Sequence, residues 1–330
     1  MRTPALALCC LLMLSACATP VVRKQTLLPA PAAEVARLTR LRVAAFENDD
    51  TGQVRAAVES ALASVVVDAR PYFTLLGASA PAGGLGKPMQ WVNSKKSQAE
   101  PIRYGAEGLV QGNVDQNDWR DEYYTEDRSE CVARDDKGRC VRTRDRHVQC
   151  VRRVAQFSFT PRVVAKDTGA VLLAQEFSET MRSSACRDKG SPASGASLLA
   201  SARARAIARF RDHVAPHYAT LDIPLLTEDD SGMSAPVKAE VERGAELAKT
   251  GLTGQACALW RKAASSHDAG FVLPYLSGVC AELEDDLDRA EDSYALAEQR
   301  AQKPVPEISA AFTRVADTRA NQERLERQLK

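Results

Sequence analysis

The stretch VAQFSFTPRVVAKDTGAVLLAQEFSETM, residues 154–181, decides the fold. It holds two runs of alternating apolar residues, joined by Lys166-Asp167-Thr168-Gly169. These four residues are typical of a turn that closes a β-hairpin, because the glycine can take the positive φ that such a bulged turn needs. We therefore predict two antiparallel strands here, at the centre of a sheet that contains antiparallel strands.

The turn also predicts the register of this hairpin. If Lys166 faces Ala170, residues at equal distances from the turn face one another, and a shift by one residue would turn the apolar face to solvent. The apolar pairs that then share one face are Val163–Leu173, Phe159–Phe177 and Ala155–Met181. Cys150 and Cys186 are opposed in the same register, and directly opposed residues bring their Cβ atoms to about 4.5–5.5 Å, close to disulfide range. We predict a Cys150–Cys186 disulfide.

The other cysteines leave the pairing open. The chain has 9 cysteines, and six of them remain after Cys9, Cys10 and Cys17 of the N-terminal segment are set aside. An even number in an oxidising compartment indicates disulfides. Consecutive pairing would add Cys131–Cys140 and Cys257–Cys280. The alternatives are pairings that cross between these hairpins, and six free thiols.

The N-terminal segment predicts export and a lipid anchor. Residues 1–16 carry one charge, Arg2, followed by an apolar run that is too short to span a bilayer permanently, which is typical of a signal peptide. Leu14-Ser15-Ala16-Cys17 resembles a bacterial lipobox, which implies acylation of Cys17, palmitate included, and cleavage before it. The alternative is an ordinary signal peptide with a chance cysteine. Because Ala18 is not aspartate, the enterobacterial sorting rule implies the outer membrane. Residues 17–36 are proline-containing, and we expect an extended, mobile tether there.

Strand and helix patterns alternate after the tether. Residues 41–46 are typical of a strand, 53–68 of an amphipathic helix and 72–76 of a second strand, which together make an α/β unit. A third strand is expected at 110–114. A helix at 197–213 and a last strand at 220–225 follow the hairpin.

At this point the chain resembles the CsgG-like superfamily, which includes the curli secretion lipoprotein, the LpoB activator of peptidoglycan synthases and the TolB N-terminal domain. The matching residues are Val43 to Asn48, Gly105-Ala106 with Val110 to Val114, and Asp167 to Leu172. The resemblance covers roughly residues 38–228 and implies a mixed sheet with helices over residues 37–228. It departs from the family at Gly77 to Glu100, where a helix is expected and none is evident.

Residues 117–153 form an unusually polar insertion in this domain. Its first arm is acidic, with Asp121, Glu122, Glu126, Asp127 and Glu130. Its second arm is basic, with Arg139, Arg142, Arg144, Arg146, Arg152 and Arg153. One interpretation is a charged docking hairpin or an anion site. We favour the other, a solvated hairpin whose arms pair opposite charges across the strands. Since both faces of the first arm carry charges, neither could face lipid, and we expect no pore.

The C-terminal part, residues 235–330, repeats with a period of 34. Gly244, Ala256, Trp260 and Ala263 are followed by Gly278, Ala290, Tyr294 and Ala297. This resembles tetratricopeptide (TPR) repeats, in which small residues let paired helices approach and an aromatic ring fills the space between them. Glu240 and Pro274 depart from the usual Trp, and Asp268 and Gln302 from the usual Pro. A last helix at 306–328 would cap the stack. The alternative is a helical bundle with coincidental spacing.

If the TPR resemblance holds, one concave face collects the residues that we predict to bind a partner. They are Lys238, Val241, Ala245, Lys249, Val272, Tyr275, Val279 and Glu282. If the apolar members of this set are exposed, they make a peptide-binding groove. If they are buried, they pack against the α/β domain.

Composition limits the function classes. The length of 330 residues favours two domains, and a net charge of +1 gives no overall field that would attract nucleic acid. No nucleophile has a recognisable base and orienting group. His213 and His217 have the spacing of metal ligands, but Pro216 lies between them, where we expect the helix to end. The spacing of His147 with Cys131, Cys140 and Cys150 fits no compact zinc finger, so we expect neither an enzyme nor a cofactor. We expect an outer-membrane lipoprotein facing the periplasm, which binds periplasmic or outer-membrane proteins as a scaffold or regulator of a cell-envelope assembly. The alternative is a component of a CsgG-like export system.

Overall fold

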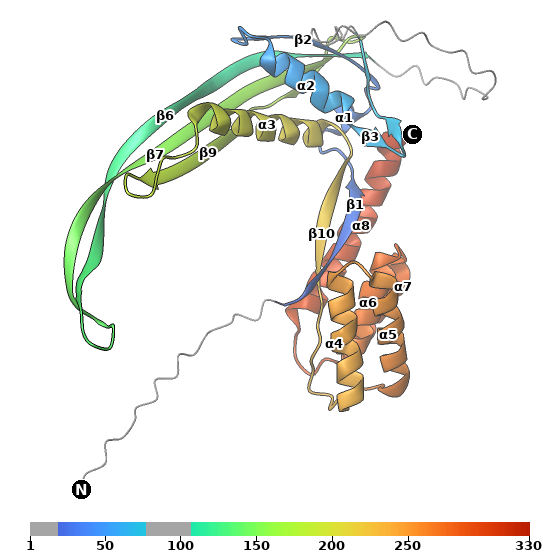
Figure 1. Ribbon diagram of the computed structural model, residues 1–330. Coiled ribbons are helices and arrows are strands. Elements are labelled where there is room, and N and C mark those ends of the chain that lie inside the picture. Colours follow the sequence, from blue (N-terminus) through green and yellow to red (C-terminus); the bar gives the residue numbers. More distant parts are fainter. Residues whose placement is uncertain (1–18, 77–106) are drawn as a thin grey trace, which may run out of the picture. The chain divides into compact units, whose positions relative to one another are not determined.

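The computed structural model describes residues 19–76 and 107–330 (Figure 1). Cys17 and the segment from Gly77 to Glu100 lie outside these residues. The chain divides into two compact units. The helical unit comprises the residues up to Leu27 together with Tyr218–Glu323, and the sheet unit comprises Leu28–His217 together with Arg324–Lys330.

The sheet unit is built on one six-stranded mixed sheet. Its elements are α1 (Ala33–Ala36), β2 (Arg40–Glu47), α2 (Gln53–Ala63), β3 (Val66–Val67), β4 (Arg70–Pro71), β5 (Thr74–Leu75), β6 (Glu107–Arg134), β7 (Cys140–Ala165), β8 (Val171–Ala174), β9 (Phe177–Cys186) and α3 (Gly195–Val214). The strand order is β5-β2-β6-β7-β8, and β9 also pairs with β7. β2 is parallel to β5 and β6, whereas β7 is antiparallel to β6, β8 and β9. This confirms a central mixed sheet that is followed by a helical region.

The predicted hairpin register is confirmed along β7. Val163 faces Leu173, Phe159 faces Phe177 and Ala155 faces Met181. The expected pairing beside the turn is wrong. The register shifts between Val163 and Val164, and the N–H of Lys166 donates to Glu107 rather than to Ala170. The bulge absorbs one residue next to the turn, so the register is kept farther out.

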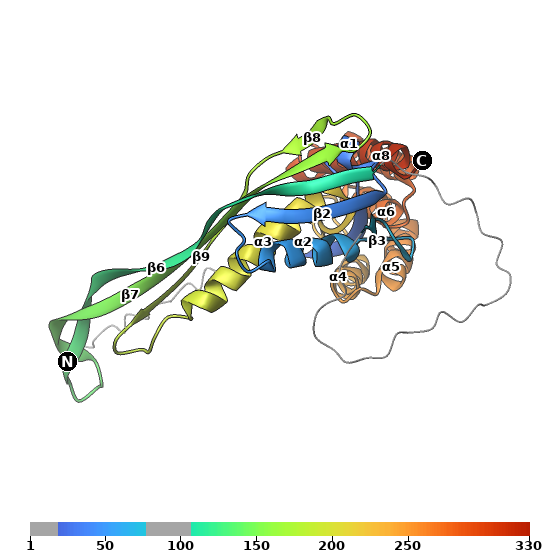
Figure 2. The same cartoon turned by 90° about the horizontal axis from the view of Figure 1, so that it is seen from above.

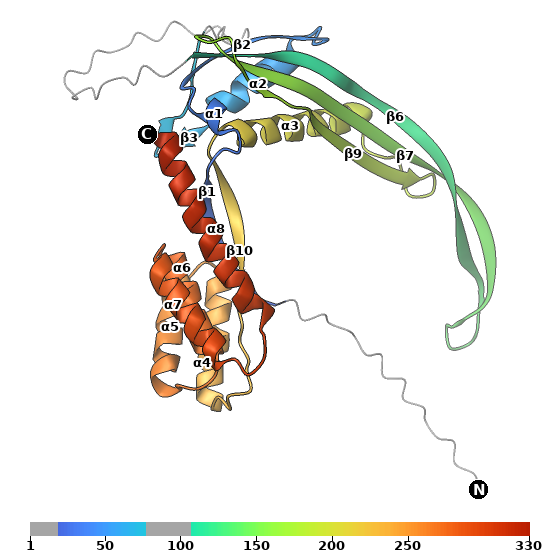
Figure 3. The same ribbon diagram turned by 180° about the vertical axis from the view of Figure 1, so that it is seen from behind.

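A phenylalanine cluster lies between the sheet and its helices. The ring centroid of Phe159 is within 6.0 Å of those of Phe46, Phe157, Phe177 and Phe210. Figure 3 shows α2 and α3 on the same side of the sheet. Small residues on α3, such as Ala202 and Ala206, are fully buried and let this helix lie close to the strands. The face predicted to be apolar is therefore the face that the helices cover.

The helix predicted over residues 53–68 is shorter than expected. α2 ends at Ala63, and Val66–Val67 instead form a small antiparallel pair with Arg70–Pro71. The run of valines explains the early end, because β-branched side chains are stiff and favour extended backbone. The second strand is also shorter, since only Thr74–Leu75 pair with β2.

β6 and β7 continue as a two-stranded ribbon beyond the end of β9 (Figure 2). Their ladder runs from Gly108–Ala165 to Arg134–Cys140. The turn at the tip is fixed by Asp135, whose carboxylate accepts the N–H groups of Lys137 and Arg139 at 3.0 and 2.8 Å. The polar insertion is thus an extension of two central strands rather than a separate element.

The helical unit contains a two-stranded sheet and five helices. They are β1 (Val21–Leu28), β10 (His217–Pro224), α4 (Ala235–Lys249), α5 (Thr253–Ser266), α6 (Val272–Leu283), α7 (Leu287–Arg300) and α8 (Pro306–Leu329). β1 pairs with β10. Of the helices in the described part of the chain, none combines the length and the apolar character needed to cross a membrane.

The predicted tether is partly wrong. Val21–Leu28 is a strand, Val22 is buried in the core of the helical unit, and Ala33–Ala36 is a short helix. β1 forms because it pairs with β10, which includes most of the last strand that we expected at 220–225 in the α/β domain. Such pairing over almost 200 residues has no local sequence signal.

Candidate functional site

The predicted binding face of the helical unit is closed. Lys238 and Lys249 are partly exposed. The other members are buried, and these are Val241, Ala245, Val272, Tyr275, Val279 and Glu282. The apolar members share one hydrophobic core with residues of β1, β10, the segment after β10, and α8. These residues are Val22, Ile223, Leu225, Ile308, Ala311 and Val315. The prediction of an open peptide-binding groove is therefore wrong, and the elements that cover this face belong to the helical unit itself.

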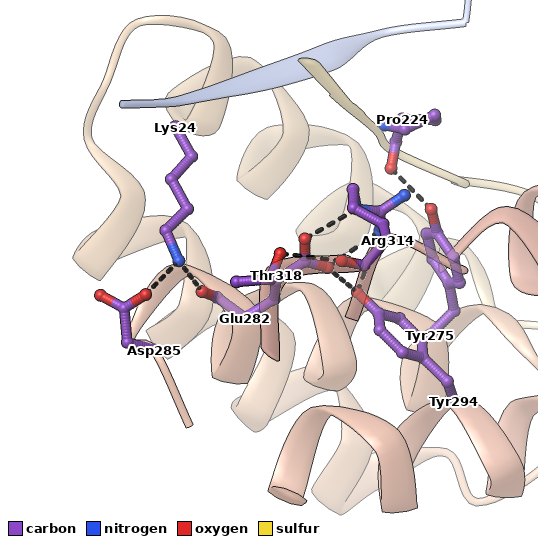
Figure 4. A network of polar contacts seen from close by, with 8 residues as sticks. All are labelled: Lys24, Pro224, Tyr275, Glu282, Asp285, Tyr294, Arg314 and Thr318. Carbon is purple, nitrogen blue, oxygen red and sulfur yellow. Dashed lines mark hydrogen bonds and ion pairs between the residues drawn. The ribbon is translucent and has the colours of Figure 1, made fainter. Parts of the chain in front are cut away.

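Glu282 is the centre of a buried polar network (Figure 4). Its side chain on α6 is 1% exposed and accepts two hydrogen bonds from the Arg314 guanidinium of α8, at 2.7 and 2.9 Å. The Tyr294 hydroxyl of α7 donates to the same carboxylate at 2.8 Å. A buried carboxylate needs such partners, since an unpaired charge is costly away from water. The network thus ties three helices together.

Polar contacts also hold β1 and β10 against α6. The Tyr275 hydroxyl donates to the Pro224 carbonyl at 2.9 Å. Lys24 of β1 donates to the Glu282 carbonyl and, at 2.6 Å, to the Asp285 carboxylate (Figure 4). The two strands are therefore fixed to α6 by polar contacts as well as by apolar packing.

The two tyrosines and the arginine of this network have raised pKa values. Burial raises the pKa of Tyr275 to about 12, and burial together with the charge of Glu282 raises the pKa of Tyr294 still further. Burial opposes the charge of Arg314, but the hydrogen bonds and charge of Glu282 outweigh it and raise its pKa. None of these groups can exchange a proton near pH 7, so the network is suited to structure and not to acid–base chemistry.

A Ser–His pair near α6 is a feature that the sequence reasoning missed. Ser231 Oγ lies 2.9 Å from His267 Nε2. Asp229 contacts the serine and not the histidine, and it accepts the N–H groups of Ser231 and Val272 at 2.9 and 3.0 Å. A catalytic triad needs the carboxylate on the histidine. The arrangement therefore caps the start of α6.

A cavity of about 220 Å³ lies beside the Cys257–Cys280 disulfide. Trp260 and Leu273 line it, and Arg261 and Arg289 are among its polar lining residues. Arg289 is already paired with Glu284 and Asp286. This cavity therefore has an apolar wall and a charged margin.

The ribbon of β6 and β7 displays aromatic side chains. Tyr123 is 75% exposed and Trp119 is 48% exposed. The Trp119 ring lies against Gly195, where a Cβ would come within 2.1 Å of it, and the Arg153 guanidinium lies 4.9 Å from its centroid. Arg153 is held by two hydrogen bonds to Asp121, at 2.7 and 2.8 Å, and these bonds lower the pKa of Asp121. One side of the Trp119 ring is therefore fixed, and part of it stays open to solvent.

The charges of the ribbon pair only in part. Asp121 pairs with Arg153 across the strands, and Glu122 pairs with Arg152 at 4.0 Å. Asp127 lies in hydrogen-bond range of His147, at 2.5 Å. The favoured interpretation, opposite charges paired across the strands, fits the first two pairs. It does not fit Arg142, Arg144 and Arg146, for which the described residues provide no ion pair.

The structure joins the cysteines as Cys131–Cys140, Cys150–Cys186 and Cys257–Cys280. These are the pairs that the register and consecutive pairing predict. Glu126 lies near the second pair, and together they are the one group within the described residues with metal-binding spacing. Sulfur atoms that are bonded to each other are not thiolate ligands, so this group cannot hold zinc in the oxidised protein.

Comparison of the chain with protein-family models and with curated protein sequences finds no match. The site must therefore be judged from its own geometry. In the described residues, that geometry offers exposed aromatic and basic side chains on a stiff ribbon, and a closed helical core.

Proposed function

We propose that this protein is an outer-membrane lipoprotein on the periplasmic side that binds other envelope proteins, as a scaffold or regulator of a cell-envelope assembly, and that the ribbon is its binding surface. The observation that carries the proposal is the exposure of Tyr123 and Trp119 on β6. Tyrosine and tryptophan are enriched in protein interfaces, where they bury a large area at little cost in side-chain entropy.

The ribbon is rigid enough to present these side chains. Cys150–Cys186 joins β7 to β9, and Cys131–Cys140 joins the two strands near the tip. The Asp121–Arg153 pair adds a bidentate contact next to Trp119. A preorganised surface loses less entropy on binding, so it binds more tightly for the same contacts.

The family assignments are part of the proposal. The order β2-α2-β5, with β6 parallel to β2 and an antiparallel hairpin next to it, supports a CsgG-like domain. Two helix pairs in which a glycine meets an aromatic ring support TPR-like repeats. In this proposal the TPR-like helices pack against β1 and β10 and do not form a peptide-binding groove.

The lipobox at Cys17 supports the anchor. Export directed by the signal peptide that precedes Cys17 would put the other cysteines in an oxidising compartment, where disulfides persist. The export-system alternative is less well supported, because both faces of the ribbon carry charges and each charge at the bilayer midplane costs about 2–4 kcal/mol.

Crosslinking in cells tests the proposal. A photoreactive amino acid at position 123 should capture one periplasmic or outer-membrane protein, identified by mass spectrometry. The matched control is position 218, because Tyr218 is a 58% exposed tyrosine of the helical unit. With the captured protein purified, Tyr123→Ala should weaken binding at least tenfold and Tyr218→Ala should not. Capture of the same products at both positions, or of none at 123, contradicts the proposal.

A further inference from the structure

Three arginines form a row on the outer part of the ribbon. Arg142, Arg144 and Arg146 occupy alternate positions of β7, so their side chains leave the same face about 6.6–6.8 Å apart. All three are exposed. Within residues 19–76 and 107–330, no carboxylate lies in ion-pair range of them, although Glu130 is directly opposite Arg144 in the ladder. We call residues 142, 144 and 146 the arginine row.

Glu130 is opposite Arg144 and forms no ion pair in the described structure, but the other nearby acidic side chains are already engaged. Glu126 and Asp188 pair with Arg128, at 2.7 and 2.9 Å. Asp145 follows the alternation to the other face and accepts a hydrogen bond from Ser129 at 2.6 Å. Three guanidinium groups that form no ion pair with the described residues, at a regular spacing, therefore remain available to an outside ligand.

The same segment has an open backbone edge. β7 pairs with β6 on one side, and on the other side β9 ends at Cys186, opposite Cys150. The last bond across that side is from the N–H of Arg187 to the Gln149 carbonyl, at 2.9 Å. Because backbone groups alternate along a strand, the N–H and C=O of Thr143 and His147 also point to this side. For residues 140–148 no neighbouring strand occupies it in the described part of the chain.

We propose that residues 140–148 bind an extended, acidic segment of a partner protein by strand addition, with its carboxylates on the arginine row. An added strand has side chains on one face at the same repeat as the row, so acidic residues at alternate positions meet successive guanidiniums while the backbones pair. Arginine–carboxylate hydrogen bonds are the strong, charge-assisted kind.

The positive charge of the arginine row also determines which strand can bind. Repulsion between the arginine rows of two copies opposes pairing of their open β7 edges. The same positive charge attracts an acidic strand and repels a basic one. This inference rests on the proposed function of the ribbon, but it concerns a different part of it from Tyr123.

A synthetic peptide tests the inference without knowledge of the natural partner. The probe is a fluorescent nine-residue peptide with glutamate at alternate positions, added to the full chain in detergent. We expect saturable binding that weakens with salt, and no binding of the lysine counterpart. The triple variant Arg142→Gln/Arg144→Gln/Arg146→Gln should lower the affinity at least tenfold. A control variant, Arg42→Gln/Arg162→Gln/Arg205→Gln, removes three exposed arginines elsewhere in the sheet unit and should bind normally.

Two further probes separate strand addition from general charge attraction. Thr143→Pro removes an N–H that points to the open edge and leaves the bonds to β6 intact, so it should abolish binding while the protein stays folded. A peptide with its alternate backbone amides methylated should not bind. No binding of the acidic peptide, normal binding by the triple variant, or equal binding of the methylated peptide overturns the inference. Failure of crosslinking at 123 with intact peptide binding would instead reject the proposed function alone.

Discussion

Gly278 lies so close to Tyr294 that a Cβ on the glycine would come within 2.5 Å of a ring carbon. At the same interval of sequence, Gly244 lies against Trp260, where a Cβ would come within 2.2 Å of the indole nitrogen. The Trp260 indole also donates to the Val241 carbonyl at 3.1 Å. α4 packs on α5 and α6 on α7 through the same pair of residue types, which explains the period of 34 in the sequence.

The first prediction is that Gly278→Ala destabilises the helical unit. The methyl group meets a buried ring, so the free energy of unfolding should fall by about 1–3 kcal/mol. Gly254→Ala in α5 is the control, because nothing lies within 4 Å of its Cβ position and alanine favours a helix. That variant should be as stable as the wild type or more so. Denaturant unfolding of the wild type and both variants measures these differences. Equal unfolding midpoints for Gly278→Ala and the wild type would contradict the close approach of Gly278 to Tyr294.

The second prediction concerns the Glu282–Arg314 pair. Arg314→Met leaves a buried carboxylate without its cation and should cost about 3–5 kcal/mol of unfolding free energy. Replacing both residues by methionine should recover part of that loss, since no buried charge remains. Arg319→Met is the control on the same helix: Arg319 pairs with Asp288 and Glu291 at the surface, so the denaturation midpoint should hardly change. A double variant less stable than Arg314→Met would contradict this account.

The third prediction is acid sensitivity at the start of α6. Burial disfavours the charge of Asp229, but hydrogen bonds from Ser231 and from the N–H groups of Val272 and Phe271 prevail and lower its pKa. A carboxyl group with a lowered pKa in the folded state stabilises the protein above its unfolded pKa of about 3.9. This contribution is lost as the pH falls through the lower, folded value.

Unfolding free energies from pH 7 down to about pH 2 measure this contribution, because the loss begins only below the unfolded pKa of about 3.9. Asp229→Asn should reduce stability at pH 7 and flatten the pH dependence. The exposed neighbour is the control, because Asp230→Asn removes a carboxylate without a hydrogen bond in the described structure. Parallel pH curves for the wild type and Asp229→Asn would show that Asp229 does not carry the effect.

The fourth prediction is the disulfide pattern and its order of reduction. Peptide mapping of the unreduced protein should find Cys150 linked to Cys186. This pair is buried, whereas Cys140 at the tip is exposed, so graded reductant should open Cys131–Cys140 first. Loss of the longer Cys150–Cys186 loop should cost roughly 3–4 kcal/mol. Cys150 found alkylated without reductant would mean that the register of β7 and β9 is wrong.

The sequence predicted those features that depend on near neighbours. The alternating apolar residues on both arms of the hairpin support the Val163–Leu173 and Phe159–Phe177 pairs, so the register could be extended to Cys186, whereas the bulge beside the turn was not predicted. By contrast, the burial of Tyr275 depends on β10 and α8, which lie far away along the chain. Its hydroxyl reaches the Pro224 carbonyl, a contact with no periodic signal in the sequence.

The lack of ion pairs at Arg142, Arg144 and Arg146 could not be predicted from the sequence for a related reason. An acidic arm beside a basic arm predicts that each arginine forms an ion pair with a carboxylate on the other strand. The structure pairs Arg152 and Arg153 with carboxylates near the base of the ribbon. The same register continues without a shift to Cys131–Thr143 and places Arg146 opposite Arg128, which is a like charge. Only the three-dimensional register reveals this.

The last prediction concerns the anchor, which lies outside the described residues. Cys17→Ser removes the thiol that would be acylated, so the protein should lose incorporation of a palmitate analogue and leave the membrane fraction. The reason is that each buried methylene contributes about 0.8 kcal/mol to membrane attachment, and several acyl chains together make it stable. Ala18→Asp is the matched control, since it keeps the thiol: acylation should persist while the protein moves from the outer to the inner membrane fraction. Membrane attachment of Cys17→Ser after a wash that removes peripheral proteins would refute the lipid anchor.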